Sequence, residues 1–240
     1  MRISKLSTVD TLGFDVIVKR SPRRRTIEII IRQGEVQLML PRFVSDQEGM
    51  HFLQQKQPWV LQTLEKQRAH TQEIVAKRYT EGELFDYLGQ SYPLRIYTAR
   101  RGGVQLVNGN LYVGIVKRTG IATTDAVQKM LWQWYRNQAM RILTEKTDAL
   151  AKKIGRSHAG VRLRRTKTKW GHCTAAGIIQ YNWQVMAAPE AVIDYLVAHE
   201  VSHLVHPNHG KRFWRHVERL FPDYKTHRQW LKTKGHTLIV

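Results

Sequence analysis

A histidine pair at helical spacing is the strongest chemical signal in the sequence. His199 and His203 lie four residues apart, and Glu200 directly follows the first of them, in the order H-E-x-x-H. Four residues turn a helix by about 400°, so both imidazoles project from one face and can bind the same metal ion. The Glu200 carboxylate then lies beside the ligands and can reach a water molecule at the metal, which is the position of a general base.

The residues around this motif are apolar. If these were two surface histidines with an acid beside them, polar neighbours would be expected, but the motif is surrounded by Leu196, Val197, Ala198, Val201 and Leu204. Val192 and Leu196 also continue the face that carries the histidines. We therefore expect a metal-binding face set into the core at the floor of a cleft.

A catalytic zinc ion needs a third protein ligand and an open fourth position. Pro207 ends the helix and can turn the chain so that His209 comes back toward the metal. The rival third ligand is Glu218, on the next expected helix, and we prefer His209. The predicted site is therefore one Zn²⁺ per chain on His199, His203 and His209.

The six-residue spacing from His203 to His209 equals that in H-E-x-x-H-x-x-G-x-x-H metalloproteases. Two features depart from that pattern. His206 stands where those enzymes have Gly, and no Met follows position 186, so their downstream Met-turn is excluded. The spacing alone therefore does not assign the chain to those enzymes.

The expected chemistry is hydrolysis of a peptide bond, in which zinc activates a water molecule and Glu200 accepts its proton. The alternative is a basic nucleic-acid-binding protein whose zinc is mainly structural. A structural site is closed by four protein ligands and has no need for an acid beside the water position. The role of Glu200 therefore separates the two hypotheses.

Helices and strands near the motif must position it. Pro189 and Glu190 begin the motif helix, with proline and an acid in its first turn. Val161–Thr168 and Gly177–Val185 are β-rich and are separated by Trp170-Gly171-His172-Cys173. A long helix is expected from Thr123 or Thr124 to Gly155.

The first 120 residues are expected to be rich in strands. A helix from Ser45 or Asp46 to about His70, interrupted at Pro58, is expected to turn Trp59, Leu61 and Leu64 inward. Strands first and helices later indicate an α+β fold, with a β-rich portion at 1–120 and the motif-bearing portion at 121–240, as one continuous unit with a weak seam near residue 120. The expected strands are Phe14–Lys19, Thr26–Arg32, Glu35–Leu40, Tyr92–Thr98, Val104–Val107 and Leu111–Val113.

The net charge of +20 favours polyanionic partners. No Asp or Glu occurs from Ala149 to Pro189, where basic residues are frequent. The charge fits either DNA or another polyanion, or a solvated basic face that keeps the protein soluble.

Cysteine content and hydropathy give an expected location. The single cysteine, Cys173, excludes an internal disulfide, and no apolar run reaches 18 residues. The sequence shows no signal-peptide pattern at Met1. We expect a cytoplasmic protein that has no membrane partner.

Several segments together resemble the YgjP-type metallopeptidases, which are relatives of the SprT and WLM families. The segments are Lys169–Cys173, Tyr181–Trp183, Asp194–Glu200, Asn208–His209 and Arg212–Trp214. The resemblance covers most of the chain, and its specific part is residues 165–231. His172 departs from the family's usual Ser in W-G-S-C, which leaves the role of this strand open.

This resemblance implies a zincin-like fold whose helical C-terminal portion carries the H-E-x-x-H helix, with zinc on His199, His203 and His209. In zincins a strand beside the metal helix pairs with the extended substrate, so residues 161–168 or 177–185 are expected to do so. Relatives of the SprT type act on proteins attached to DNA, so nucleic-acid-associated substrates are a further expectation.

Other residues are weaker candidates. Tyr195, Tyr181 and Arg165 are candidates for stabilising the oxyanion of the transition state. His206 is a candidate for assisting that transition state. His216 is expected on a helix surface. Cys173 is expected to be packed and inert, and Trp170, Trp183 and Trp214 are expected to be core aromatics.

Overall fold

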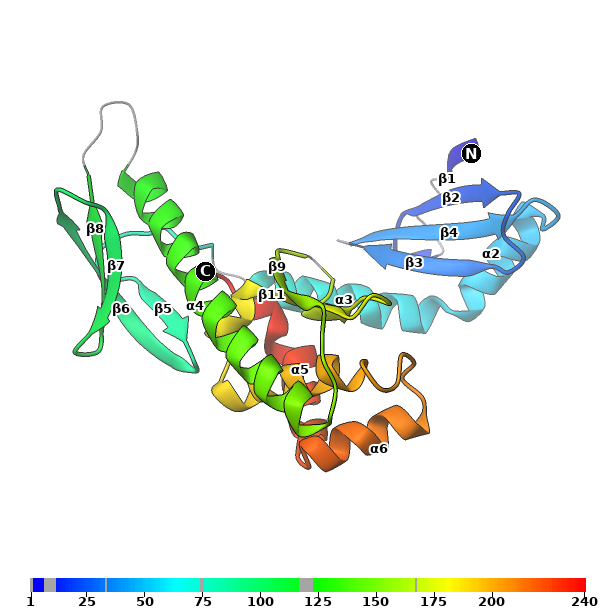
Figure 1. Ribbon diagram of the computed structural model, residues 1–240. Coiled ribbons are helices and arrows are strands. Elements are labelled where there is room, and N and C mark those ends of the chain that lie inside the picture. The colour runs from blue at the N-terminus through cyan, green and yellow to red at the C-terminus, as the bar shows by residue number, and fades with distance from the viewer. Residues whose placement is uncertain (1, 7–11, 33, 74–75, 117–122, 167) are drawn as a thin grey trace. The chain divides into compact units, whose positions relative to one another are not determined.

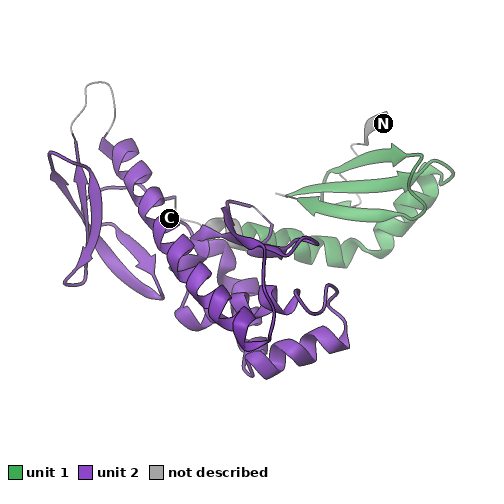
Figure 2. Cartoon of the chain, in the orientation of Figure 1, with its two compact units in different colours: residues 1–75 green, residues 76–240 purple. Residues whose placement is uncertain are grey.

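The computed structural model describes residues 2–6, 12–32, 34–73, 76–116, 123–166 and 168–240 (Figure 1). Contacts among these residues divide the chain into two compact units, Met1–Val75 and Ala76–Val240 (Figure 2). The expected seam near residue 120 lies among residues 117–122, outside the described residues. The contacts place residues 76–116 in the same unit as the helices that follow, and each unit has its own apolar core.

The first unit is a four-stranded sheet with two helices. Its strand order is β1-β2-β4-β3, with β2 and β4 parallel and the other neighbours antiparallel. The expected strands at Thr26–Arg32 and Glu35–Leu40 correspond to β3 and β4, which pair antiparallel from Arg32 and Glu35 outward. The elements are β1 (Arg2–Leu6), β2 (Val16–Ser21), β3 (Glu28–Arg32), β4 (Glu35–Pro41), α2 (Asp46–Gln55) and α3 (Gln57–Glu73).

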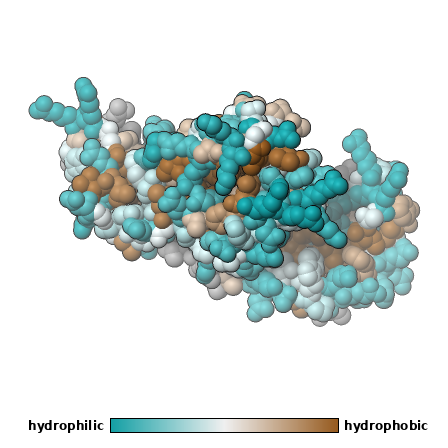
Figure 3. Space-filling view, turned by 60° about the horizontal axis from the view of Figure 1, so that its bottom comes forward, coloured by the Kyte–Doolittle hydropathy of each residue, from teal (hydrophilic) through white to brown (hydrophobic). Residues whose placement is uncertain are grey.

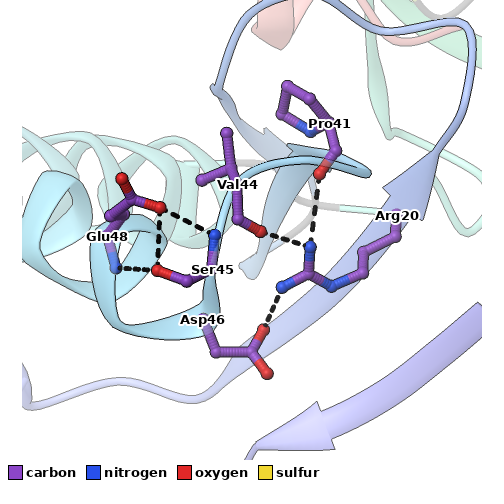
Figure 4. A network of polar contacts seen from close by, with 6 residues as sticks. All are labelled: Arg20, Pro41, Val44, Ser45, Asp46 and Glu48. Carbon is purple, nitrogen blue, oxygen red and sulfur yellow. Dashed lines mark hydrogen bonds and ion pairs between the residues drawn. The ribbon is translucent and has the colours of Figure 1, made fainter.

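Polar contacts fix the start of α2 against the sheet (Figure 4). Ser45 caps the helix, and the Ser45 and Glu48 side chains each hydrogen-bond the backbone N–H of the other residue, which is a capping box. From β2, the Arg20 guanidinium donates to the Val44 carbonyl at 2.5 Å and to the Asp46 carboxylate at 2.6 Å. The helix therefore begins where the sequence predicts, and one arginine joins it to the sheet.

The predicted interruption at Pro58 is confirmed, because α2 ends at Gln55 and Pro58 lies in the first turn of α3. The predicted inward face of α3 is wrong in part. Trp59 is 50% exposed and Leu61 is 42% exposed. Leu64 is buried as predicted, and Val60, which was not predicted, is buried as well.

The second unit begins with a sheet of the same topology. Its strand order is β5-β6-β8-β7, and again only the central pair, β6 and β8, is parallel. Each sheet is followed by helices. The same arrangement of four strands therefore occurs twice, although the sequence shows no internal repeat. The strands are β5 (Leu84–Tyr87), β6 (Gln90–Thr98), β7 (Gly103–Val107) and β8 (Asn110–Ile115).

Helix α4 (Thr123–Lys153) lies between this sheet and the remaining helices (Figure 1). It packs on β7 and β8 on one side and on α5 (Glu190–Ser202) on another. A three-stranded sheet of order β10-β11-β9 completes this unit, and α5 packs against α4, α6, α7 and β10. The remaining elements are β9 (Gly160–Arg164), β10 (Gly171–Cys173), β11 (Ile178–Asn182), η1 (Trp183–Ala187), α6 (Lys211–Leu220), α7 (Tyr224–Lys234) and η2 (Gly235–Thr237).

The fold is therefore mixed α+β, with strands early and helices late, as predicted. None of the described helices combines the length and apolar character that crossing a bilayer requires. Hydrophilic side chains cover much of the face in Figure 3, with apolar patches between them.

The turn between β5 and β6 fixes the beginning of α5. Leu88 and Gly89 both have positive φ, and the Leu88 N–H donates to the Met186 carbonyl at 2.8 Å. A Cβ atom at Gly89 would lie 2.9 Å from Pro189 Cα, directly before α5. The missing side chain therefore allows the turn to pack against the start of this helix.

Replacement of Gly89 with alanine is expected to destabilise the protein more than the same change at Gly82. Both glycines have φ near +80°, but nothing lies within 4 Å of a Cβ at Gly82. Gly82→Ala should lower the free energy of unfolding by about 1–2 kcal/mol from backbone strain. Gly89→Ala should lower it by at least about 1 kcal/mol more, from overlap with Pro189. Urea unfolding of both variants measures the difference, and equal losses would contradict the proposed packing.

Candidate metal centre

Three imidazoles meet where α5 ends. His199 lies in the last turn of α5, His203 is its C-cap, and His209 follows in the loop before α6. One ring nitrogen of each residue lies within 4.8 Å of the others. The Nε2 atoms of His199 and His209 are 3.0 Å apart. Two nitrogens bound at zinc distances to a tetrahedral ion lie about 3.3 Å apart, so this pair is close to the spacing of two ligands.

Neighbouring groups hold the rings in place. His203 Nδ1 lies 3.1 Å from the His206 carbonyl oxygen, to which it can donate, and this leaves Nε2 of His203 for a metal. Phe213, fully buried on α6, contacts all three rings at centroid distances of 4.5–5.0 Å. The cluster is therefore supported by packing as well as by one hydrogen bond.

The local electrostatics keep the three imidazoles neutral. Burial lowers the pKa of His199 to about 3, with further lowering by His203, His209 and Arg228. Burial also lowers the pKa values of His203 and His209. A metal binds neutral imidazole, so these shifts favour the ligand form near neutral pH.

Two buried polar atoms at the cluster, His199 Nδ1 and Glu200 Oε2, have no hydrogen-bond partner among the described residues. A buried polar group without a partner costs about 1–3 kcal/mol, so such groups are rare outside functional sites. The donor set of three imidazoles suits zinc and other transition metals and does not suit Mg²⁺ or Ca²⁺. The residues present therefore fit a transition-metal ion.

Glu200 lies beside the cluster on the same helix and is 3% exposed. Burial raises its pKa to about 8, while Lys169 and a hydrogen bond from the Cys173 backbone lower it. A metal cation at the histidines would also lower this pKa, because it favours the carboxylate. Its position beside the three histidines suits proton transfer and does not require Glu200 to bind a metal itself.

Gly171 of β10 makes room for this carboxylate. A Cβ atom there would lie 2.3 Å from Glu200 Oε1 and 2.6 Å from its Cδ, which is far inside van der Waals contact. From the sequence, the role of this segment between two β-rich stretches stayed open. The glycine contact shows that this short strand shapes the surroundings of Glu200.

Two cavities flank the cluster. One of 480 Å³ is lined by residues of β10, α5 and α7, among them Gly171, Tyr195, Glu200 and Arg228. The other, of 750 Å³, is lined by Cys173, Leu204 and their neighbours. Lys169, His172, His203 and His209 line both cavities. The histidines therefore lie in a cleft that extends to both sides of them.

The structure also separates the other candidates. Glu218 is exposed on α6, lies 4.0 Å from Lys225 and does not join the histidine group. Tyr181 is buried and hydrogen-bonds Thr147 at 2.9 Å, and Arg165 stacks on Trp132. Of the three proposed transition-state stabilisers, only Tyr195 lines a cavity at the cluster.

The remaining expectations are confirmed only in part. His216 was expected on a helix surface, but it is buried, and its ring faces His206 at a centroid distance of 5.6 Å. Cys173 is half-buried, and burial raises the pKa of its thiol, which is consistent with an inert residue. Sequence reasoning missed Arg228, since nothing in its neighbourhood indicates that α7 returns to the metal helix.

Replacement of Gly171 with alanine tests the arrangement around Glu200. The added methyl group must displace the carboxylate, and a misplacement of about 1 Å costs about 10²-fold in rate. We expect kcat to fall by this factor while the metal content stays unchanged. Gly103→Ala is the matched control, because nothing lies within 4 Å of its Cβ. Full activity of Gly171→Ala would show that Glu200 can move without loss of function.

Comparison with known proteins identifies the family of the chain. No curated protein sequence matches the chain. One solved structure, the metallopeptidase zymogen of Pyrococcus abyssi abylysin, aligns at 22% identity with a TM-score of 0.36, over 41% of this chain and 100% of that one. A TM-score this low does not establish a shared fold. The family model of the YgjP-like metallopeptidase domain matches residues 25–234. This range includes the three histidines and Glu200, and the chain belongs to the YgjP-like metallopeptidase family.

Proposed function

We propose that the protein is a zinc-dependent peptidase in which His199, His203 and His209 hold one Zn²⁺ and Glu200 is the general base. Family membership establishes a metallopeptidase, which acts on proteins or peptides with the help of a metal ion. The observation that carries the finer proposal is the convergence of three neutral imidazoles, with a buried carboxylate on the same helix. Three nitrogen ligands with an open fourth position are typical of catalytic zinc.

When bound, the zinc ion would supply an activated water molecule and would polarise the carbonyl group of the substrate. The chain itself handles the protons. Glu200 accepts a proton from the attacking water and delivers it to the leaving amine. The room left by Gly171 and the hydrogen bond from the Cys173 backbone orient the Glu200 carboxylate for both transfers.

Two further groups complete the proposed mechanism. Tyr195 lines the cleft one helical turn before His199, and no hydrogen bond occupies its hydroxyl among the described residues. Burial raises its pKa to about 12, so the hydroxyl stays protonated and can donate to the developing oxyanion. Strand β10 is an edge strand that packs on α5. We propose that β10 pairs with the extended substrate. We also propose that the fold is zincin-like.

Sequence reasoning expected residues 161–168 or 177–185 to pair with the substrate. Strand β11, in the second of these segments, has β9 on one side and β10 on the other, so both of its edges are occupied. Strand β9 is the other edge of the sheet and lines neither cavity at the histidines. These positions favour β10 over both expected segments.

Metal analysis of purified variants tests the ligands. Wild type should contain one zinc per chain, and His199→Ala and His209→Ala should lose it. Glu218→Ala should keep it, because Glu218 lies outside the histidine group. Elemental analysis of folded protein after refilling with Zn²⁺ measures the stoichiometry. Zinc retained by His209→Ala but lost by Glu218→Ala would reverse the assignment of the third ligand.

Replacement of Glu200 with glutamine tests the general base. Glutamine keeps the shape of the side chain but cannot accept the proton, so kcat should fall by at least about 10²-fold. Zinc content should stay at the wild-type value. Loss of zinc in Glu200→Gln would mean that Glu200 is a ligand, and undiminished turnover would remove it from the mechanism.

We also propose, as a second candidate, that the substrates are associated with nucleic acid. The comparisons do not support nucleic-acid-associated substrates. The proposal rests on the positive charge of one segment of the chain. Among the described residues from 149 to 189, every lysine and arginine is exposed and none forms an ion pair within 4.0 Å. These residues are Lys152, Lys153, Arg156, Arg162, Arg164, Arg165 and Lys169.

If this basic segment contacts about six phosphates, its affinity for duplex DNA should fall by about 10³-fold between 50 and 200 mM salt. Fluorescence anisotropy of a labelled duplex measures this dependence. Salt-independent binding, or no binding at 50 mM salt, would remove the nucleic-acid proposal and leave the peptidase proposal intact.

A further inference from the structure

The two sides of the cleft differ in charge. Arg228 and Lys232 line only the 480 Å³ cavity, and Lys169 lies where the two cavities meet. Glu200 is the one carboxylate in that lining, and it is buried against β10. The 750 Å³ side is lined chiefly by small or neutral residues such as Thr174, Ala175, Ala176, Gly177 and Pro207.

The three cations have no carboxylate partner of their own. Among the described residues, no Asp or Glu oxygen lies within 4.0 Å of the charged nitrogens of Lys169, Arg228 or Lys232. All three side chains are exposed. They are therefore free to bind an anionic group that enters the cleft.

Arg228 is held in place by aromatic packing. Its guanidinium carbon lies 4.3 Å from the centroid of the Trp214 ring. Trp214 in turn stacks on His209 at 5.7 Å and on Tyr224 at 5.5 Å. A stacked guanidinium loses little conformational entropy when it binds, and its planar donors match a carboxylate. Lys232 lies one helical turn after Arg228, so α7 directs both cations to the same side.

We propose that Lys169, Arg228 and Lys232 form a subsite that binds a carboxylate group of the substrate on one side of the histidine cluster. The peptidase then favours peptides with an Asp or Glu side chain, or a C-terminal carboxylate, on that side of the scissile bond. The opposite side accepts neutral or small side chains. This inference rests on the peptidase function proposed above and adds the class of substrate.

Binding to a catalytically impaired chain tests the subsite without turnover. The full-length Glu200→Gln chain, refilled with Zn²⁺, is titrated with pools of randomised, fluorescent, C-amidated nonapeptides. Paired pools differ only by Glu or Gln at one fixed position, and each of the nine positions is tested. A further pair compares a free with an amidated C-terminus in a neutral pool. These two arms separate a side-chain carboxylate from a terminal one.

At least one carboxylate-bearing pool is expected to bind about tenfold more tightly than its neutral partner, as for a charge-assisted hydrogen bond. Arg228→Gln in the same background should bring this ratio close to one, and Arg228→Lys should restore part of it. Lys225→Gln is the control. Lys225 lies on the same helix, 5.7 Å from the Tyr224 ring, and lines neither cavity.

A ratio of one in every pair, or a ratio that Arg228→Gln leaves unchanged, would overturn the subsite. The peptidase proposal is judged separately, from cleavage of the same pools by the wild-type chain with zinc. Absence of cleavage together with a carboxylate preference would defeat the peptidase proposal and leave a carboxylate-binding cleft.

Discussion

The burial of ionisable groups in an apolar helix is the constraint on which the second unit depends. Nine of the thirteen residues of α5 are buried, and Glu200 is one of them. Removing a carboxylate and an imidazole from water is unfavourable, and the raised pKa of Glu200 and the lowered pKa of His199 both report this cost. The packing of α4, α6, α7 and β10 around α5 must offset it.

This constraint explains why the elements around α5 come from distant parts of the sequence. The β5–β6 turn closes on Pro189, β10 passes over Glu200, and Phe213 packs beneath the imidazoles. None of these residues is proposed to contact the metal. Each restricts where the histidine rings or the Glu200 carboxylate can lie. Metal binding and proton transfer both require such preorganisation.

The sequence predicted the local features well. The H-E-x-x-H spacing is a property of one helix, and a histidine six residues later needs only one turn of chain to return, so both could be found without a structure. The limits of the long helix followed from Thr123 and Gly155. The capped start at Ser45 and the interruption at Pro58 also depend on short-range chemistry.

What the sequence could not predict depends on long-range packing. The role of β10 requires its approach to α5, and three residues carry no periodicity that would reveal a strand. Arg228 reaches the cleft only because α7 folds back on α5. On α3, Trp59 and Leu61 are exposed although both are hydrophobic, because Val60 and Leu64 occupy the buried side of that helix.

The closeness of the three histidines along the chain has a consequence for metal exchange. All three lie within eleven consecutive residues, at the end of a helix most of whose residues are buried. In small zinc-folded domains, the free energy of metal binding is largely the free energy of folding, and chelation unfolds them. Here the three histidines adjoin an extensive apolar core, so we expect chelation to remove a bound ion without unfolding the chain.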